Sequence, residues 1–433
     1  MELRGLKIIS IIFYFVTISA VLSDGIDVVY PSVITLRSGA KILKFRLLEE
    51  DVELRLEPAG KVISDNFTIV NGKGERDESV DVKRLKSKLY KNEKIGAALH
   101  IDEKESLKVH GIINSYLRIE PIRPEEMDRK GKRAHHIIEL KKDKNVYIKD
   151  QVIPKKLNEL LNFKARVLNS NECLMIKYVF ITESTFTESF IERNIGLTDY
   201  VATMFVQVQN LFHTLELNIE ISMVGILAYT KSDEASFIEQ SVIPGYEEYL
   251  NCEDLLDNMA IYFYSNPIEY RHVEWADIVI LLVKRKWGDL INGDVYANTA
   301  GISFVGGICD KRYKYGVCED DANFMERVDT IAHESGHLLG CPHDGQGPVP
   351  GIPYSPGSEA CPESQGYLMS STQSEENRQK FSPCCRENVQ NLLSWIETAQ
   401  SIIQICKFDG DDNDNYHYND EDYHVDNDDA DDA

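Results

Sequence analysis

The sequence predicts two folded regions, a mostly β N-terminal region followed by an α/β (α+β) domain built on a mixed, twisted sheet. From residue 24 to about residue 165, apolar and polar residues alternate with period two, which is typical of half-buried strands. Beyond residue 173, apolar strand-like runs alternate with segments of helical spacing, which favours helices packed on a mixed sheet. The 433 residues are enough for two or three such units.

The N-terminus predicts a secretory signal peptide over residues 1–23. Arg4 and Lys7 precede an apolar run over residues 8–22, and the small Ser23 suits a cleavage site just after it. The alternative is a signal anchor, but the run is shorter than the roughly 20 apolar residues that a membrane span needs. We therefore expect a secreted, extracellular protein with no membrane contact after signal cleavage.

The N-terminal region carries two features with open alternatives. Asn66-Phe67-Thr68 is a glycosylation sequon, which either carries a glycan or is an unused match. The basic run over residues 129–133 is either a solvated charged surface or a processing site.

The second region has a regular order of expected elements. Apolar runs predict its strands, and residues spaced three and four apart predict its helices. The expected strands are 174–182, 219–229, 278–283 and 300–306, and the expected helices are 197–215 and 254–264.

The nine cysteines indicate an oxidising compartment. None precedes Cys173, and seven lie from Cys309 to Cys406, so we expect disulfide bonds within one domain. The odd count leaves one thiol free or paired between chains, and the sequence does not fix the pairings.

The net charge of −24 is unevenly spread, because residues 408–433 hold twelve Asp or Glu and no Lys or Arg. Such a run repels itself and buries little, which predicts a disordered acidic tail. Weak divalent-ion binding by the tail is the lesser alternative to an ordinary solvated segment. The acidic balance argues against nucleic-acid binding, which requires basic surface.

The chemistry is concentrated in residues 333–343, His-Glu-Ser-Gly-His-Leu-Leu-Gly-Cys-Pro-His. On a helix, His333 and His337 stand on one face, one turn apart, and can bind one zinc ion. Gly340 permits a left-handed turn that ends the helix, so that His343 can complete a three-histidine site. The fourth position is then expected to be open to water, as in catalytic zinc sites.

Glu334 follows the first histidine and is the expected general base. Its carboxylate can take a proton from a water that zinc has acidified, and can pass it to the leaving amine. The alternative is that three histidines lie together by chance as satisfied polar residues. Three His, one Glu and one Gly at fixed offsets within eleven residues make that alternative remote.

The pattern His-Glu-x-x-His-x-x-Gly-x-x-His resembles the signature of the metzincin zinc metalloproteases. Asp344 resembles the reprolysin (adamalysin) branch, and the Cys-rich zinc region looks most like the tick salivary enzymes. Residues 367–370 resemble the Met-turn, in which Met369 would lie beneath the metal without binding it. Residues 299–309 resemble the family's edge strand, whose free backbone groups would pair with an extended substrate.

The resemblance covers about residues 28–406 and implies four parts: a signal peptide over 1–23, a propeptide over 24–170, a reprolysin-like catalytic domain over 171–407, and the tail over 408–433. It implies a secreted metalloendopeptidase with one catalytic Zn²⁺, acting on extracellular proteins such as fibrinogen. Calcium stays open, because Asp277 suits the family's calcium site but Ile176 and Lys177 do not.

Two rival functions remain. One is a secreted binding protein on a protease fold, although such proteins often lose the base or a ligand, and Glu334 is present here. The other is a tail that captures cations or basic partners.

Latency is expected to come from steric cover of the cleft. Many metzincin precursors use a propeptide cysteine, but residues 24–172 contain none. Cys173 is the nearby candidate for such a switch, and a disulfide bond, for instance with Cys252, is the favoured alternative.

Overall fold

The computed structural model describes residues 25–122, 134–140, 150–154, 174–193, 195–267, 270–297, 299–322, 325, 327–371, 374 and 376–395. Several sequence predictions lie outside these residues. They are the signal peptide, the basic run 129–133, Cys173, the boundary near residue 170 and the acidic tail. In the described part of the chain, no helix is long and apolar enough to cross a membrane.

The N-terminal region forms a nine-stranded antiparallel sheet around its own core. The alternation expected from the sequence is confirmed in β3, where buried residues recur at every second position. In spatial order the strands are β1 (Ile26–Val29), β10 (His135–Glu139), β9 (Leu117–Pro121), β8 (Lys108–Ile112), β7 (Ala97–Asp102), β6 (Leu89–Asn92), β4 (Glu50–Pro58), β3 (Lys41–Leu47) and β2 (Ser32–Thr35).

A seven-stranded mixed sheet carries the second region. All of its neighbouring strands run parallel except β19 and β20, which are antiparallel. In spatial order the strands are β11 (Gln151–Val152), β19 (Gly301–Phe304), β20 (Tyr315–Glu319), β16 (Ile278–Val283), β12 (Leu174–Thr182), β13 (Ile219–Ala228) and β5 (Ile63–Asn71).

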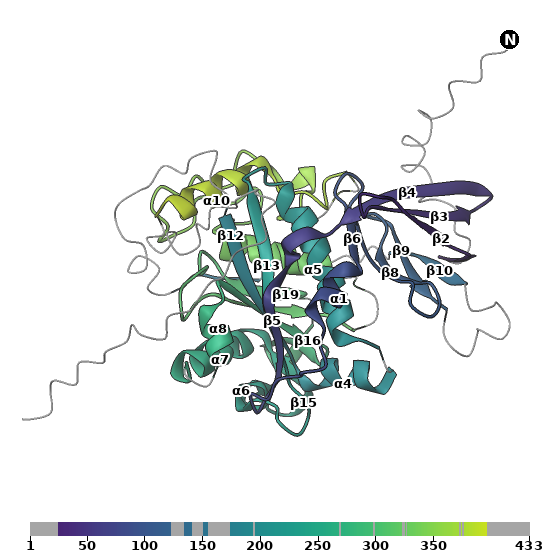
Figure 1. Cartoon of the computed structure of the whole chain (residues 1–433). Helices are drawn as coiled ribbons and strands as arrows, with labels where there is room; N and C mark the ends of the chain where they lie inside the picture. Colours follow the sequence, from purple (N-terminus) through teal and green to yellow (C-terminus); the bar gives the residue numbers. More distant parts are fainter. Residues whose placement is uncertain are drawn as a thin grey trace, which may run out of the picture.

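Both edges of this mixed sheet come from the N-terminal region, which the sequence did not predict. Strand β5 pairs with β13 at one edge, and β11 pairs with β19 at the other. In Figure 1 the purple β5 runs among the later strands, away from the other N-terminal strands. The N-terminal region therefore covers both unpaired edges of the sheet, which would otherwise expose free backbone groups.

Helix α5 (Leu197–His213) joins the two sheets. It contacts β13 and helix α9 in the second region, and β6 and β7 in the first. Every residue from Tyr200 to Phe212 is buried, as expected for a helix covered on all sides.

The remaining elements lie mostly in the second region, with α1 and the first 3₁₀ turn in the N-terminal region. A small sheet contains β14 (Val242–Ile243), β15 (Tyr246–Asn251), β17 (Lys286–Ile291) and β18 (Asp294–Tyr296). The helices are α1 (Val82–Ser87), α4 (Ser184–Arg193), α6 (Ser236–Gln240), α7 (Cys252–Ser265), α8 (Arg271–Trp275), α9 (Val328–Leu338) and α10 (Pro383–Trp395), with short 3₁₀ turns at Gly60–Val62 and Glu363–Gln365. The strands and helices expected beyond residue 173 are all present within a few residues of their predicted bounds.

Candidate active site

Helix α9 presents His333, Glu334 and His337, and all three side chains are fully buried. The apolar residues Ile331 and Leu338 of the same helix lie in the core. The helix packs against β19 and β20, so the mixed sheet fixes the direction of its polar residues.

Gly340 ends helix α9 as the sequence predicts. Its φ of 88° is in the left-handed region. The amide of Gly340 donates to the His337 carbonyl at 2.8 Å, and the amide of Cys341 donates to the Gly336 carbonyl at 3.0 Å. This pair of bonds is a Schellman motif, which reverses the chain and directs His343 back toward the helix.

The three imidazoles converge on the carboxylate of Asp150, a residue that the sequence analysis did not select. Nε2 of His333 lies 3.1 Å from Asp150 Oδ2 and 3.2 Å from Nε2 of His343. Asp150 Oδ1 lies 3.1 Å from Nε2 of His343 and 3.7 Å from Nε2 of His337. Among the described residues, these four form the one group of His, Cys, Asp or Glu side chains arranged to hold a metal ion.

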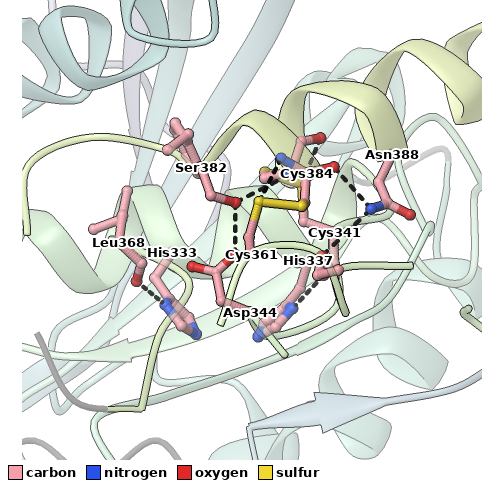
Figure 2. Close-up of a disulfide and its surroundings, with 12 residues drawn as sticks. His333, His337, Cys341, Asp344, Cys361, Leu368, Ser382, Cys384 and Asn388 are labelled. Atoms are coloured by element: carbon pink, nitrogen blue, oxygen red, sulfur yellow. Dashed lines mark hydrogen bonds between the residues drawn. A yellow bond between two sulfur atoms is a disulfide. The ribbon is translucent and has the colours of Figure 1, made fainter. Parts of the chain in front are cut away.

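The outer nitrogens of the imidazoles are tied to other groups. Nδ1 of His333 donates to the Leu368 carbonyl at 2.7 Å, and Nδ1 of His337 donates to the Cys341 carbonyl at 2.8 Å (Figure 2). A carbonyl can only accept, so each Nδ1 carries a proton and each Nε2 is turned toward the cluster. Such outer hydrogen bonds are typical of metal-binding histidines.

The spacing of the converging atoms fits one metal ion, since all four ligand atoms lie within 4.8 Å of one another. In a tetrahedral zinc site with bonds of about 2.0–2.1 Å, neighbouring ligand atoms are about 3.3 Å apart. The distances of 3.1, 3.2 and 3.7 Å between the converging atoms lie close to that value. Within the described residues, Nε2 of His337 has no hydrogen-bond partner, as expected for an atom placed to bind a metal. Burial also lowers the pKa of His337 to about 4, so its imidazole is neutral near pH 7.

The segment that resembles the Met-turn packs against helix α9. Met369 is fully buried, and a Cβ on Gly336 would lie only 2.7 Å from its sulfur. Asp344 accepts hydrogen bonds from Ser370 at 3.0 Å and from Ser382 at 2.5 Å. Figure 2 shows the Ser382 contact beside His333 and Leu368. Asp344 thus joins the end of the histidine segment to two later segments of the chain.

Glu334 faces the edge strand β19. Ser303 donates a hydrogen bond to its Oε2 at 2.7 Å, while Oε1 has no hydrogen-bond partner among the described residues. A Cβ on Gly301 would lie 2.3 Å from Oε1, so only glycine admits the carboxylate there. Burial raises the pKa of Glu334 well above its usual value, and the nearby Asp150 carboxylate adds to this increase.

Strand β19 is the edge strand that the sequence predicts, but here it is paired. The amide of Ser303 donates to the Asp150 carbonyl at 2.9 Å, and the amide of Val305 donates to the Val152 carbonyl at 2.9 Å. The position expected to be open to water holds the Asp150 carboxylate. Both departures have one cause, the parallel pairing of β11 with β19.

The cysteine predictions need correction. Two disulfide bonds, Cys341–Cys385 and Cys361–Cys384, join the histidine segment and its neighbours to helix α10, as clustering predicts. Cys252 is a free, buried thiol, so the suggested pairing of Cys173 with Cys252 is wrong, while a disulfide bond of Cys173 to another partner stays a prediction. Cys309 and Cys318 are also free, which makes three free thiols among the described residues instead of one. Cys252 and Cys318 are fully buried in the core and behave as small apolar side chains.

The residues that sequence analysis missed are Asp150, Gln151 and Ser303. The Gln151 side-chain amide lies 2.8 Å from Nδ1 of His343, so Asp150 and the next residue, the first of β11, contact the two nitrogens of one ring. A single Asp or Gln in an extended segment belongs to no motif that could be recognised by its spacing. The available clue was indirect: residues 24–172 contain no cysteine to reach the cluster.

Fold and site together define the class, a metallopeptidase of α/β type with a His-rich candidate metal site. Residues 173–382 match the Reprolysin_5 profile of metallopeptidase family M12. Venom metalloproteinase BumaMPs1 of Olivierus martensii is 40% identical over 398 residues, which cover 92% of this chain and 97% of that protein. Venom metalloproteinase antarease TserMP_A of Tityus serrulatus is 40% identical over 397 residues, covering 91% and 98%. The chain therefore belongs to metallopeptidase family M12 and is a reprolysin-type metalloprotease.

Proposed function

We propose that the protein is the secreted precursor of a zinc metalloendopeptidase that cleaves extracellular proteins. The observation that carries the proposal is the convergence of three imidazole Nε2 atoms beside a buried glutamate. In this proposal His333, His337 and His343 bind one Zn²⁺, and Glu334 is the general base. Residues 1–23 are the signal peptide, 24–170 the propeptide, 171–407 the catalytic domain and 408–433 an acidic tail.

The residues of the site have distinct roles in this proposal. A bound zinc ion supplies Lewis acidity, which polarises the scissile carbonyl and acidifies a water molecule. Glu334 accepts the proton of the attacking water on its carboxylate and delivers it to the leaving amine. Ser303 holds one carboxylate oxygen in place, which leaves Oε1 for the proton. Strand β19 binds the extended substrate once β11 is gone.

Secretion and substrate class are supported by the names of the relatives, which are venom metalloproteinases. Blood or matrix proteins such as fibrinogen are the substrate class we propose. Both relatives are scorpion proteins, so the closer likeness to tick salivary enzymes stays a prediction.

The test uses the processed wild-type protein and Glu334→Gln, which keeps the size of the side chain. Each is incubated with a peptide library with and without a chelator, and the cut ends are sequenced. We expect chelator-sensitive cleavage by the wild type, an unchanged zinc content in the variant, and a loss of turnover of about 10²–10⁴-fold or more. The exposed Glu363→Gln serves as the control. A wild-type protein that binds proteins but cuts nothing would favour the rival binding function.

A further inference from the structure

The carboxylate of Asp150 occupies the centre of the candidate metal site. The side chain is fully buried, and it faces the three imidazoles at 3.1 to 3.7 Å. Complete burial of a carboxylate costs several kcal/mol unless charged or hydrogen-bonded groups compensate it. We therefore expect a positively charged or hydrogen-bonding group next to the Asp150 carboxylate.

The imidazoles present their inner nitrogens to this carboxylate. His333 and His337 each use Nδ1 to bond a carbonyl, so each turns Nε2 toward Asp150. A divalent cation between these atoms would compensate the buried carboxylate, and imidazole and carboxylate are both established ligands for zinc.

The backbone around Asp150 is fixed independently of the metal. The Asp150 and Val152 carbonyls accept hydrogen bonds from the Ser303 and Val305 amides, both at 2.9 Å. The intervening Gln151 contacts His343 at 2.8 Å and Gln346 at 3.0 Å through its side-chain amide. Residues 150–152 therefore hold the Asp150 carboxylate at the candidate metal site and also cover the edge of β19.

We propose that Asp150 is the fourth metal ligand of the precursor, and that residues 150–152 keep the protease latent by closing the metal site and the substrate edge together. The proposal rests on the three-histidine zinc site proposed above and identifies how that site is regulated. In this proposal the Asp150 carboxylate occupies the ligand position that a propeptide thiolate occupies in many metzincin precursors. Activation then requires β11 to leave β19, which frees the ligand position and the strand edge in one step.

The experiment uses the uncleaved full-length chain loaded with Co²⁺, whose visible absorption reports the ligands of the metal. Wild type, Asp150→Ala and Asp150→Asn are titrated with azide, and metal loss to 1,10-phenanthroline is timed. We expect azide to change the spectrum of the Asp150 variants but not of the wild type. Phenanthroline should remove the metal about 10- to 100-fold faster from the variants. Before cleavage of the chain, hydrolysis of a short quenched peptide should stay far below that of the processed enzyme in both variants, because β11 still covers the substrate edge of β19.

Two controls separate the possible outcomes. Asp51→Asn changes an exposed N-terminal carboxylate and should match the wild type in every readout. Asp150→Asn keeps the shape and the backbone bonds, so it decides the matter if Asp150→Ala does not fold.

A precursor that holds one metal ion, with the Asp150 variants identical to the wild type in spectrum and metal loss, overturns the proposal and leaves the zinc site standing. A folded precursor and a processed enzyme that both fail to hold stoichiometric metal instead overturn the proposed function itself.

Discussion

The hydroxyl of Ser303 donates a hydrogen bond to Oε2 of Glu334 at 2.7 Å, and thereby joins the edge strand β19 to helix α9, which carries the candidate metal site. The same strand is the proposed docking edge for substrate. One short segment would then set both substrate binding and the position of the proposed base.

Ser303→Ala should lower kcat of the processed enzyme about 10- to 100-fold with little change in KM. The hydroxyl contributes one hydrogen bond to a charged group, worth about 1.5–3 kcal/mol, whereas the substrate would pair with backbone atoms that the variant retains. Steady-state kinetics on a short peptide measures the two constants. Ser232→Ala, in an exposed loop, is the control. An increase in KM alone would place Ser303 in substrate binding and not in orientation of the base.

His343→Ala should weaken zinc affinity by at least about 10- to 100-fold and loosen the segment after Gly340, since metal binding and local folding are coupled. Metal analysis after dialysis against a weak chelator measures the loss. His272→Ala, which changes a half-buried histidine of α8, should keep its zinc. Retention of tightly held, stoichiometric zinc by the His343 variant would show that His343 is not a ligand.

Gly336→Ala should lower the free energy of unfolding by about 1–3 kcal/mol, because overpacking of a filled core forces neighbours to move. The new Cβ would lie 2.7 Å from the Met369 sulfur and 3.0 Å from Cε1 of Phe381. Thermal unfolding of the precursor measures the change. Gly347→Ala is the matched control, since its Cβ would meet its nearest neighbour at 3.7 Å. Equal stability of the two variants would mean that Met369 is free to move.

Asp320 should make the precursor less stable as the pH rises. Burial raises the pKa of Asp320 to about 7, although hydrogen bonds from the Ala322 amide and the Tyr200 hydroxyl oppose the increase. In the unfolded chain the pKa of an Asp is about 3.9, so between the two values the folded state binds the extra proton. The contribution of Asp320 to the free energy of unfolding therefore falls by up to about 1.4 kcal/mol per pH unit from about pH 4 to 7.

Asp320→Asn stays neutral at every pH and should remove this slope. Chemical denaturation at pH 5, 6 and 7 compares the variant with the wild type, and Asp51→Asn, which changes an exposed carboxylate, is the control. The same slope in wild type and Asp320→Asn would mean that the carboxyl of Asp320 is ionised throughout this range.

Sequence reasoning reached the elements and residues whose signal is local. The helix-end turn at Gly340, the buried strand Ile278–Val283 and the alternation in β3 all follow from neighbours in the chain. Pairings between distant residues carry no such signal. Nothing near Asp150 in the sequence indicates its contact with His333, and nothing in β5 shows that it pairs with β13 instead of its own neighbours. Cysteine partners are likewise set by distant residues, and the suggested Cys173–Cys252 pair is wrong for this reason.

The pairing of β5 with β13 has a consequence for how the chain acquires its structure. During synthesis β5 emerges long before β13, so it must wait for a partner that is far along the chain, and closing such a large loop slows folding. Because β5 is synthesised first, it is already available for pairing when β13 is synthesised. Cleavage at the proposed propeptide boundary would separate β5 covalently from the strand it pairs with. The lifetime of the cleaved protein would then depend on the height of its unfolding barrier, because an unfolded molecule would have to refold without β5 in the same chain.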